Sequence, residues 1–155
     1  MIVLMLILLG AWISLFLPPL FFHLGWYTAG FIFHSSFSSI CHQIPDRCFF
    51  WLGYPLPVCA RCFGLLTGLT LGLMEAALHG VRSSSTPLNN RLIWAAAFLL
   101  AVDVSAPVCG LYTQTHFTRF VSGSLFGLAF SPHIYFALEE IRIRLISKHQ
   151  GALSL

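Results

Sequence analysis

Charged side chains are scarce in this sequence. Asp, Glu, Lys and Arg together make up 8% of the 155 residues, whereas hydrophobic residues make up 57%. About a quarter of the residues in a typical soluble domain are charged. A chain with so few charges cannot cover its surface with groups that water solvates. This shortage excludes a water-soluble globular protein and indicates an integral membrane protein.

Basic residues are also few, and they are scattered along the chain. Lys and Arg number eight against five acidic residues, so the formal net charge is +3. They form no basic stripe on a helix or loop, which is the feature that binding to a nucleic-acid backbone requires. We therefore expect a lipid bilayer, and no nucleic acid, as a partner of this chain.

Four apolar segments have about the length needed to cross a bilayer, roughly 20 residues of helix. We predict transmembrane helices at residues 1–22, 58–78, 92–108 and 117–138. A cleavable signal peptide is the alternative for the first segment, but it has no basic start and no small-residue cleavage site. Residues 24–40 are apolar but carry Trp, Tyr, His and Ser, which is typical of an interfacial helix at the headgroup level.

The predicted fold is therefore an all-α membrane protein with a single integral membrane domain, residues 1–155. Four transmembrane helices, the interfacial helix and a polar Cys/His loop precede a polar, exposed tail at 139–155. Glycines four residues apart let helix backbones approach closely and hold a bundle together. Such glycines occur in the second and fourth predicted helices: Gly64, Gly68, Gly72, Gly123 and Gly127.

The basic residues near the helix ends predict the orientation in the membrane. Arg47 and Arg61 lie at one end of the predicted bundle. The larger group lies at the other end, in a loop and in the tail: Arg82, Arg91, Arg142, Arg144 and Lys148. Because cytoplasmic segments carry the excess of Lys and Arg, both termini are predicted to be cytoplasmic and the Cys/His loop extracytoplasmic.

Metal-ligand residue types gather in the loop before the second predicted helix. Cys59 and Cys62 form a C-x-x-C where this helix begins, and Cys41 and His42 precede it. Thiolate and imidazole are the ligands that zinc prefers, and iron accepts similar donors. Because four such groups complete a tetrahedron, we predict a metal site of Cys41, His42, Cys59 and Cys62. Zinc is the expected ion and iron the alternative.

Two other interpretations of these cysteines stay open. In one, Cys59 and Cys62 belong to a quinone-linked thiol-disulfide oxidoreductase, with Cys48 or Cys109 as the partner thiol. In the other, the protein is a scaffold and the metal is purely structural. A closed set of four ligands favours a structural metal and an open position favours a catalytic one. Whether the protein is an enzyme therefore stays open as well.

Asp103 is the one acidic residue well inside a predicted transmembrane helix. A lone carboxylate in lipid is unfavourable, so Asp103 is expected to face the bundle and to pair with a basic group. Arg119 is the expected partner, with Arg61 and His116 as alternatives. The pair either fixes the helix register or forms a polar pocket that opens to the outer leaflet, for a small-molecule or lipid substrate. In the second case Asp103, Arg119 and Arg61 are candidate catalytic residues.

The motifs resemble a bacterial membrane family called domain of unknown function 2085. The resemblance covers about residues 25–130 and implies a small multi-span protein of the bacterial plasma membrane, with no particular activity attached. Gln43 and Arg61, which belong to its motifs, are expected to support the metal ligands. It rests on Cys41-His42-Gln43, Pro45-x-Arg47, Pro57-Val58-Cys59-Ala60-Arg61-Cys62-x-Gly64, Asp103 and Arg119-x-x-x-Gly123.

Overall fold

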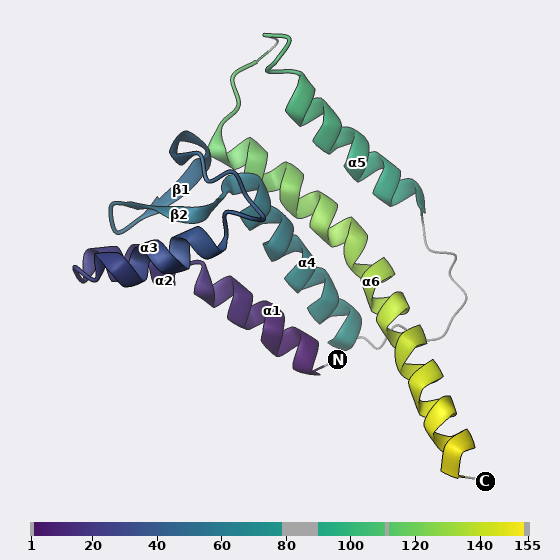
Figure 1. Ribbon diagram of the computed structural model, residues 1–155. Coiled ribbons are helices and arrows are strands. Elements are labelled where there is room, and N and C mark those ends of the chain that lie inside the picture. Colours follow the sequence, from purple (N-terminus) through teal and green to yellow (C-terminus); the bar gives the residue numbers. More distant parts are fainter. Residues whose placement is uncertain (1, 79–89, 111, 154–155) are drawn as a thin grey trace.

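Helices dominate the chain, and one two-stranded hairpin interrupts them (Figure 1). The structure is a computed structural model that describes residues 2–78, 90–110 and 112–153. In chain order its elements are α1 (Ile2–Ser14), α2 (Leu17–His23), α3 (Tyr27–Ser36), the 3₁₀ turn η1 (Pro45–Arg47), β1 (Cys48–Trp51), β2 (Tyr54–Cys59), α4 (Ala60–Leu78), α5 (Asn90–Ser105) and α6 (His116–Leu153).

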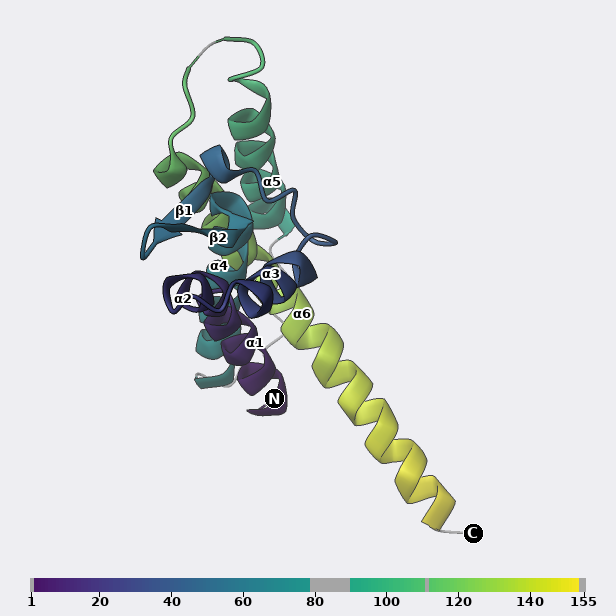
Figure 2. The same ribbon diagram turned by 60° about the vertical axis from the view of Figure 1, so that its left-hand side comes forward.

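Helices α4 and α6 touch through their backbones. A Cβ atom placed on Gly64 would lie 2.2 Å from the carbonyl oxygen of Phe120, and one placed on Gly68 would lie 2.1 Å from that of Ser124. Four residues along α4 thus correspond to four residues along α6. The two helices therefore run parallel and begin at the same end of the molecule (Figures 1 and 2). The predicted packing through small residues is confirmed.

Helix α5 lies between α4 and α6 in the sequence and runs in the opposite direction to both. It packs against α6. Asp103, near its C-terminal end, is hydrogen-bonded to Arg61 at the start of α4 and to Ser122 near the start of α6. Helix α5 is therefore antiparallel to both, and its last turns lie where α4 and α6 begin.

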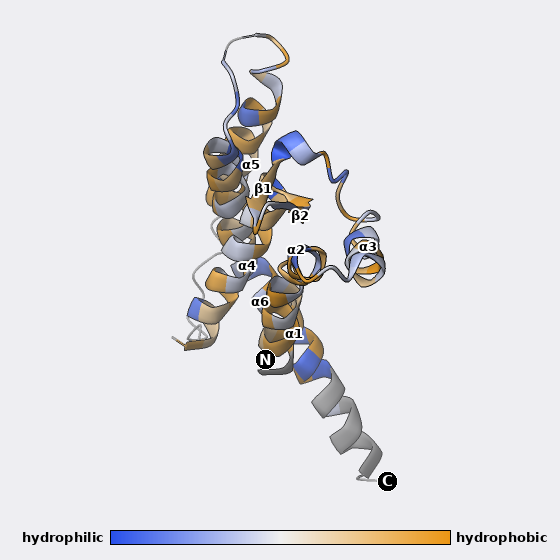
Figure 3. Cartoon of the chain, turned by 90° about the vertical axis from the view of Figure 1, so that its left-hand side faces the viewer, coloured by the Kyte–Doolittle hydropathy of each residue, from blue (hydrophilic) through white to orange (hydrophobic). Residues whose placement is uncertain are grey.

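Three stretches of the described residues are long and apolar enough to cross a membrane: Leu4–His23, Ala60–Leu78 and His116–Arg144. Hydrophobic residues dominate these helices, whereas η1, just before β1, is hydrophilic (Figure 3). Helix α5, where the sequence predicts a fourth transmembrane helix, has 16 residues. At 1.5 Å per residue it extends about 24 Å, less than the roughly 30 Å of a bilayer core.

The first of these stretches is bent rather than one straight helix. The chain turns at Leu15 and Phe16, between α1 and α2. Pro18 and Pro19 lie in the first turn of α2, where an amide donor is not needed, and both are buried. The predicted transmembrane helix over residues 1–22 is therefore divided in two.

Helices α2 and α3 lie side by side across the end of α1 (Figures 1 and 2). The Phe21 ring pairs with Trp26 and Phe33, with ring centroids 5.9 and 5.4 Å apart. Trp26 and Phe31 are exposed. Helix α3 thus falls inside the segment 24–40 and has the exposed aromatic side chains that a headgroup region attracts.

The prediction of an all-α fold is wrong for residues 48–59, which form an antiparallel hairpin. Its two turn residues, Leu52 and Gly53, have φ angles of 52° and 84°. A tight two-residue hairpin turn of this type has positive φ at both central positions. Asn-Gly is the usual sequence at such a turn. Leu52 gives no such signal, so the sequence reads as an irregular loop. The hairpin places Cys48 opposite Cys59 and leads the chain straight into α4.

Helix α6 continues through the segment predicted as a polar tail and ends at Leu153. Its described side chains from 140 to 144 are exposed, as predicted for this polar segment. Charged side chains three or four positions apart support an exposed helix. Two such ion pairs line it, Arg142 with Glu139 and Arg144 with Glu140.

The backbone contact between α4 and α6 predicts a large effect of a single methyl group. Gly68→Ala would force a Cβ into the Ser124 carbonyl, so we expect the free energy of unfolding to fall by about 1–3 kcal/mol. The measurement is thermal unfolding in detergent. Gly10→Ala is the matched control, because an added Cβ at this α1 glycine meets nothing within 4 Å. Equal melting temperatures for the two variants would contradict the backbone contact.

Candidate metal centre

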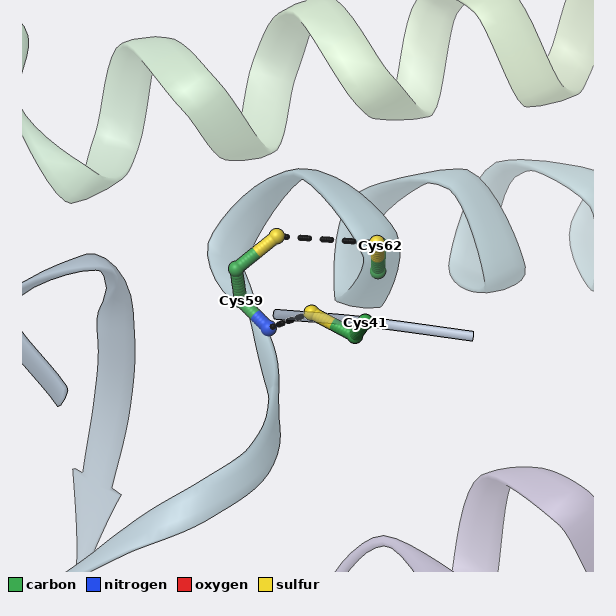
Figure 4. A group of neighbouring side chains, drawn as sticks. All are labelled: Cys41, Cys59 and Cys62. Carbon is green, nitrogen blue, oxygen red and sulfur yellow. Dashed lines mark hydrogen bonds between the residues drawn. The ribbon is translucent and has the colours of Figure 1, made fainter. Parts of the chain in front are cut away.

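Three cysteine sulfurs converge at the start of α4. The Sγ atoms of Cys41, Cys59 and Cys62 all lie within 4.8 Å of one another. Cys59 and Cys62 are 3.5 Å apart at Sγ, and the backbone N–H of Cys59 donates to Sγ of Cys41 at 3.1 Å (Figure 4). Cys59 ends β2, Cys62 lies in the first turn of α4, and Cys41 follows α3. The fold thus brings Cys41 to the C-x-x-C stretch that joins β2 to α4.

Gln43 holds the Cys41 segment against the hairpin. Its backbone has a φ of 52°, in the left-handed region that few side chains adopt. Its side-chain amide donates to the carbonyl oxygens of His34, at 2.5 Å, and Pro57, at 2.9 Å. Both amide hydrogens are therefore used to join α3 to β2. Gln43 supports the cluster by fixing the backbone on which Cys41 lies.

The surroundings of Cys59 favour its thiolate. Its hydrogen bond with Cys62, together with that to Cys41 and with backbone amides of the first turn of α4, lowers the pKa of Cys59 to about 5, although burial acts in the opposite direction. A helix N-terminus is a general means of stabilising a thiolate. These contacts favour the thiolate form of Cys59, which is the form that binds a metal or acts as a nucleophile.

Cys48 is different from the three clustered cysteines. It is buried, its thiol donates to the Ile44 carbonyl oxygen at 3.2 Å, and it is not part of the sulfur group. Burial, followed by the nearby charges of Cys41 and Cys59, raises the pKa of Cys48 to about 12. The raised pKa favours the protonated thiol of this buried hairpin residue. Cys109, beyond α5, is exposed and also lies outside the group.

The structure brings together three of the four predicted ligands. His42 is exposed, and its ring nitrogens are not within the distance that joins the three sulfurs. It does line the same pocket as the cysteines. This pocket has a volume of about 340 Å³, and three arginines from different elements also line it: Arg47, Arg61 and Arg119.

Asp103 pairs with Arg61, one of the predicted alternatives, and not with Arg119, the partner predicted first. The Asp103 carboxylate accepts hydrogen bonds from Nε and Nη2 of Arg61, at 2.9 and 2.8 Å. Arg119 instead donates from Nε to the side-chain oxygen of Gln114, at 3.0 Å, and the Gln114 amide donates to the Asp103 backbone carbonyl. Arg61 takes the place of Arg119 as the partner of Asp103 because the contact between α4 and α6 brings Arg61 beside the end of α5.

Two further hydroxyl groups complete the surroundings of the buried Asp103. Ser122 Oγ donates to the carboxylate at 3.0 Å, and the Tyr112 hydroxyl donates at 2.5 Å. The hydrogen bond to Asp103 raises the pKa of Tyr112, so this hydroxyl stays protonated and remains a donor. Sequence reasoning missed both residues, and it gave Arg47 no role at the site. The sequence indicates these residues only by position, because each is a polar residue near the helix end at which Asp103 lies.

The fold and the site define a class, a helical membrane protein with a cysteine cluster at one end of its bundle. The family described as "Predicted membrane protein (DUF2085)" matches residues 41–132, from the first clustered cysteine into α6. The chain belongs to this family.

Two relatives extend the comparison. An uncharacterized protein of Methanocaldococcus jannaschii is 32% identical over 121 residues, which are 75% of this chain and 78% of the relative. An uncharacterized protein of Methanothermobacter thermautotrophicus is 31% identical over 88 residues, 56% of this chain and 77% of the relative. Both relatives are archaeal proteins. No solved structure matches the chain.

We predict that removing the charge of Asp103 destabilises the protein, because Arg61 would then lose its acidic partner. Asp103→Asn would leave Arg61 charged and largely enclosed, and we expect it to lower the free energy of unfolding by about 3 kcal/mol or more. Glu140→Gln is the control, because it breaks the exposed pair with Arg144 and is expected to change stability by less than about 1 kcal/mol. Thermal unfolding in detergent compares them, and similar losses from both variants would argue against a buried pair.

Proposed function

We propose that this protein is a membrane protein that binds one zinc ion, with iron as the alternative, through Cys41, Cys59 and Cys62. The convergence of the three sulfurs carries the proposal. A tetrahedral zinc ion with Zn–S bonds of about 2.3 Å separates its sulfurs by about 3.8 Å. The distance of 3.5 Å between Cys59 and Cys62, and the limit of 4.8 Å for the group, agree with that spacing.

The fourth ligand position decides what the metal does. His42 would close the site and make the metal structural, as in a scaffold, whereas a water molecule would leave a reactive position. The sulfurs line a pocket of about 340 Å³, and this supports the open position. A zinc ion there would act as a Lewis acid on a membrane-associated substrate that the protein converts or transfers.

We further propose that α5 crosses the membrane and that α2 and α3 lie at its interface. Parallel α4 and α6 both cross in the same direction, so the chain must return between them, and α5 supports this because it is antiparallel to both. The basic residues then favour cytoplasmic termini and an extracytoplasmic cysteine cluster in the plasma membrane. Arg91, Arg142 and Arg144 lie at the cytoplasmic end, and Arg82 is outside the described residues.

A second candidate function uses the same thiols for redox chemistry. Cys59 and Cys62 are already adjacent, and the lowered pKa of Cys59 supports attack by its thiolate. Forming a Cys59–Cys62 disulfide from the Cys59 thiolate and the Cys62 thiol would release two electrons and one proton. A membrane quinone would accept them with one proton from water and leave as the quinol. The same disulfide would remove two of the three proposed metal ligands, so the two functions exclude each other in one molecule at one time.

Metal analysis of the detergent-purified protein tests the first proposal. We expect about one zinc or iron atom per chain. Cys59→Ser and Cys62→Ser should weaken metal binding by more than the roughly 10- to 100-fold that loss of a supporting residue causes. Cys109→Ser is the matched control, because this cysteine is exposed and lies outside the cluster. His42→Ala releases the metal if His42 is a ligand and retains it if the position is open.

Two results would contradict the metal proposal. One is purified protein that contains no stoichiometric metal and takes none up from a buffered zinc solution. The other is an equal loss of metal in Cys59→Ser and Cys109→Ser, since that would mean that the ion binds cysteines without regard to the cluster.

Thiol trapping in intact cells tests the redox candidate. If the protein is a quinone-linked oxidoreductase, Cys59 and Cys62 should shift between free thiols and a disulfide when respiration is blocked, as read by the mass added by a maleimide. A Cys62→Ser variant should show no such shift. Thiols that stay in one state under both conditions rule the redox function out. A membrane-impermeant maleimide applied to the same cells should label Cys109 if the proposed orientation is correct.

A further inference from the structure

Three arginines face one pocket, and this is more positive charge than the surrounding protein neutralises. Arg47 comes from η1, Arg61 from the first turn of α4 and Arg119 from the first turn of α6, and all three line the pocket of about 340 Å³. Arg119 interacts electrostatically with both Arg47 and Arg61. Like charges held this close repel one another, so their convergence needs an explanation.

Only one of the three has an acidic partner within the described residues. Arg61 is paired with Asp103, and the other ion pairs there join residues of the exposed part of α6. Arg119 uses Nε for the neutral Gln114 side chain. No hydrogen bond within the described residues uses its two Nη atoms or the guanidinium of Arg47, and Arg47 is exposed to solvent.

The cysteine cluster does not remove this excess. A zinc ion with three thiolates carries a single negative charge. Adding the Asp103 carboxylate still leaves the three guanidinium groups with a net positive charge. The first turn of α4 also begins at this pocket, and the partial positive charge of a helix N-terminus acts in the same direction.

We propose that the pocket binds a phosphate-class oxyanion, either free or as the headgroup phosphate of a lipid. Arg47 and Arg119 hold its oxygens with their unused N–H groups, and Arg61, fixed by Asp103, adds charge and its remaining Nη1. The planar guanidinium group matches the oxygens of phosphate in paired hydrogen bonds. This inference goes beyond the metal site, because the arginines recognise the anion whichever chemistry the cysteines perform.

The location favours a membrane-derived ligand as one of the two sources. The pocket lies where α4 and α6 begin, and these helices are long and apolar enough to span a bilayer. Lipid phosphates occupy that level of a membrane. Ile40 and Ile44, which also line the pocket, offer an apolar surface to the remainder of such a molecule.

Isothermal titration of the detergent-solubilised full chain tests the proposal. One arm uses sodium phosphate, a second uses dioctanoyl phosphatidic acid, and a third uses dioctanoylglycerol as the matched lipid without a phosphate group. We expect phosphate or phosphatidic acid to bind wild type, and Arg47→Gln and Arg119→Gln each to weaken binding by about tenfold or more. Arg142→Gln, on the exposed part of α6, is the matched control and should leave binding unchanged.

The arms separate the two sources of the anion. Similar affinities for phosphate and phosphatidic acid identify a free anion, whereas a much higher affinity for phosphatidic acid identifies a lipid headgroup. Absence of binding in both arms overturns the proposal. So does a loss in Arg142→Gln equal to that in Arg47→Gln, and so does equal affinity for dioctanoylglycerol. If Arg119→Gln fails to fold, Arg119→Lys replaces it and should retain intermediate affinity, because it keeps the charge and loses the fork.

Metal analysis of the same preparations keeps this inference distinct from the proposed function. Phosphate binding by protein that holds no metal would remove the metal proposal and leave the anion site standing. A stoichiometric metal in protein that binds neither phosphate nor phosphatidic acid would do the reverse.

Discussion

The direct backbone contact between α4 and α6 determines most of the other features of this structure. Glycines on both helices remove the side chains that would keep the backbones apart, and the residue pairing makes the helices parallel. Parallel neighbours begin at the same end of the bundle. That end therefore receives Cys62 and Arg61 from α4, and Arg119 from α6. The site exists because two helix starts, 56 residues apart in sequence at Ala60 and His116, coincide in space.

The Asp103–Arg61 pair connects the third helix to this end. Asp103 is the buried acid of α5, and its carboxylate accepts hydrogen bonds from Arg61, Tyr112 and Ser122. By binding Arg61, it fixes one guanidinium group beside the cysteines and leaves Arg119 with a neutral partner. The same contact therefore stabilises the bundle and determines which arginines are available to the pocket.

The sequence predicted well what depends on hydropathy and on local spacing. Apolar segments of bilayer length located α4 and the first part of α6, the four-residue glycine spacing predicted their packing, and C-x-x-C predicted two adjacent sulfurs. Each of these properties is encoded within one or two helical turns. The Cys41-His42 pair adds two ligand types near the C-x-x-C, which predicts that Cys41 joins these sulfurs, and its sulfur lies in the cluster.

Features that depend on three-dimensional geometry were missed. Leu52 at positive φ allows a hairpin turn that its residue type does not suggest. The partner of Asp103 depended on how closely two helices approach, since both Arg61 and Arg119 lie at the correct level. His42 is next to Cys41 in sequence, but neighbouring residues point in different directions, so only one of them joins the sulfur group.

The central claim is that three cysteine sulfurs from separate segments share one metal ion. X-ray absorption at the metal edge of the purified protein tests it most directly, because the method counts the neighbours of the ion by element and distance. The account predicts three sulfur atoms at about 2.3 Å from zinc and one nitrogen or oxygen atom at about 2.0 Å. A metal ion with nitrogen and oxygen neighbours only, and no sulfur, would contradict it.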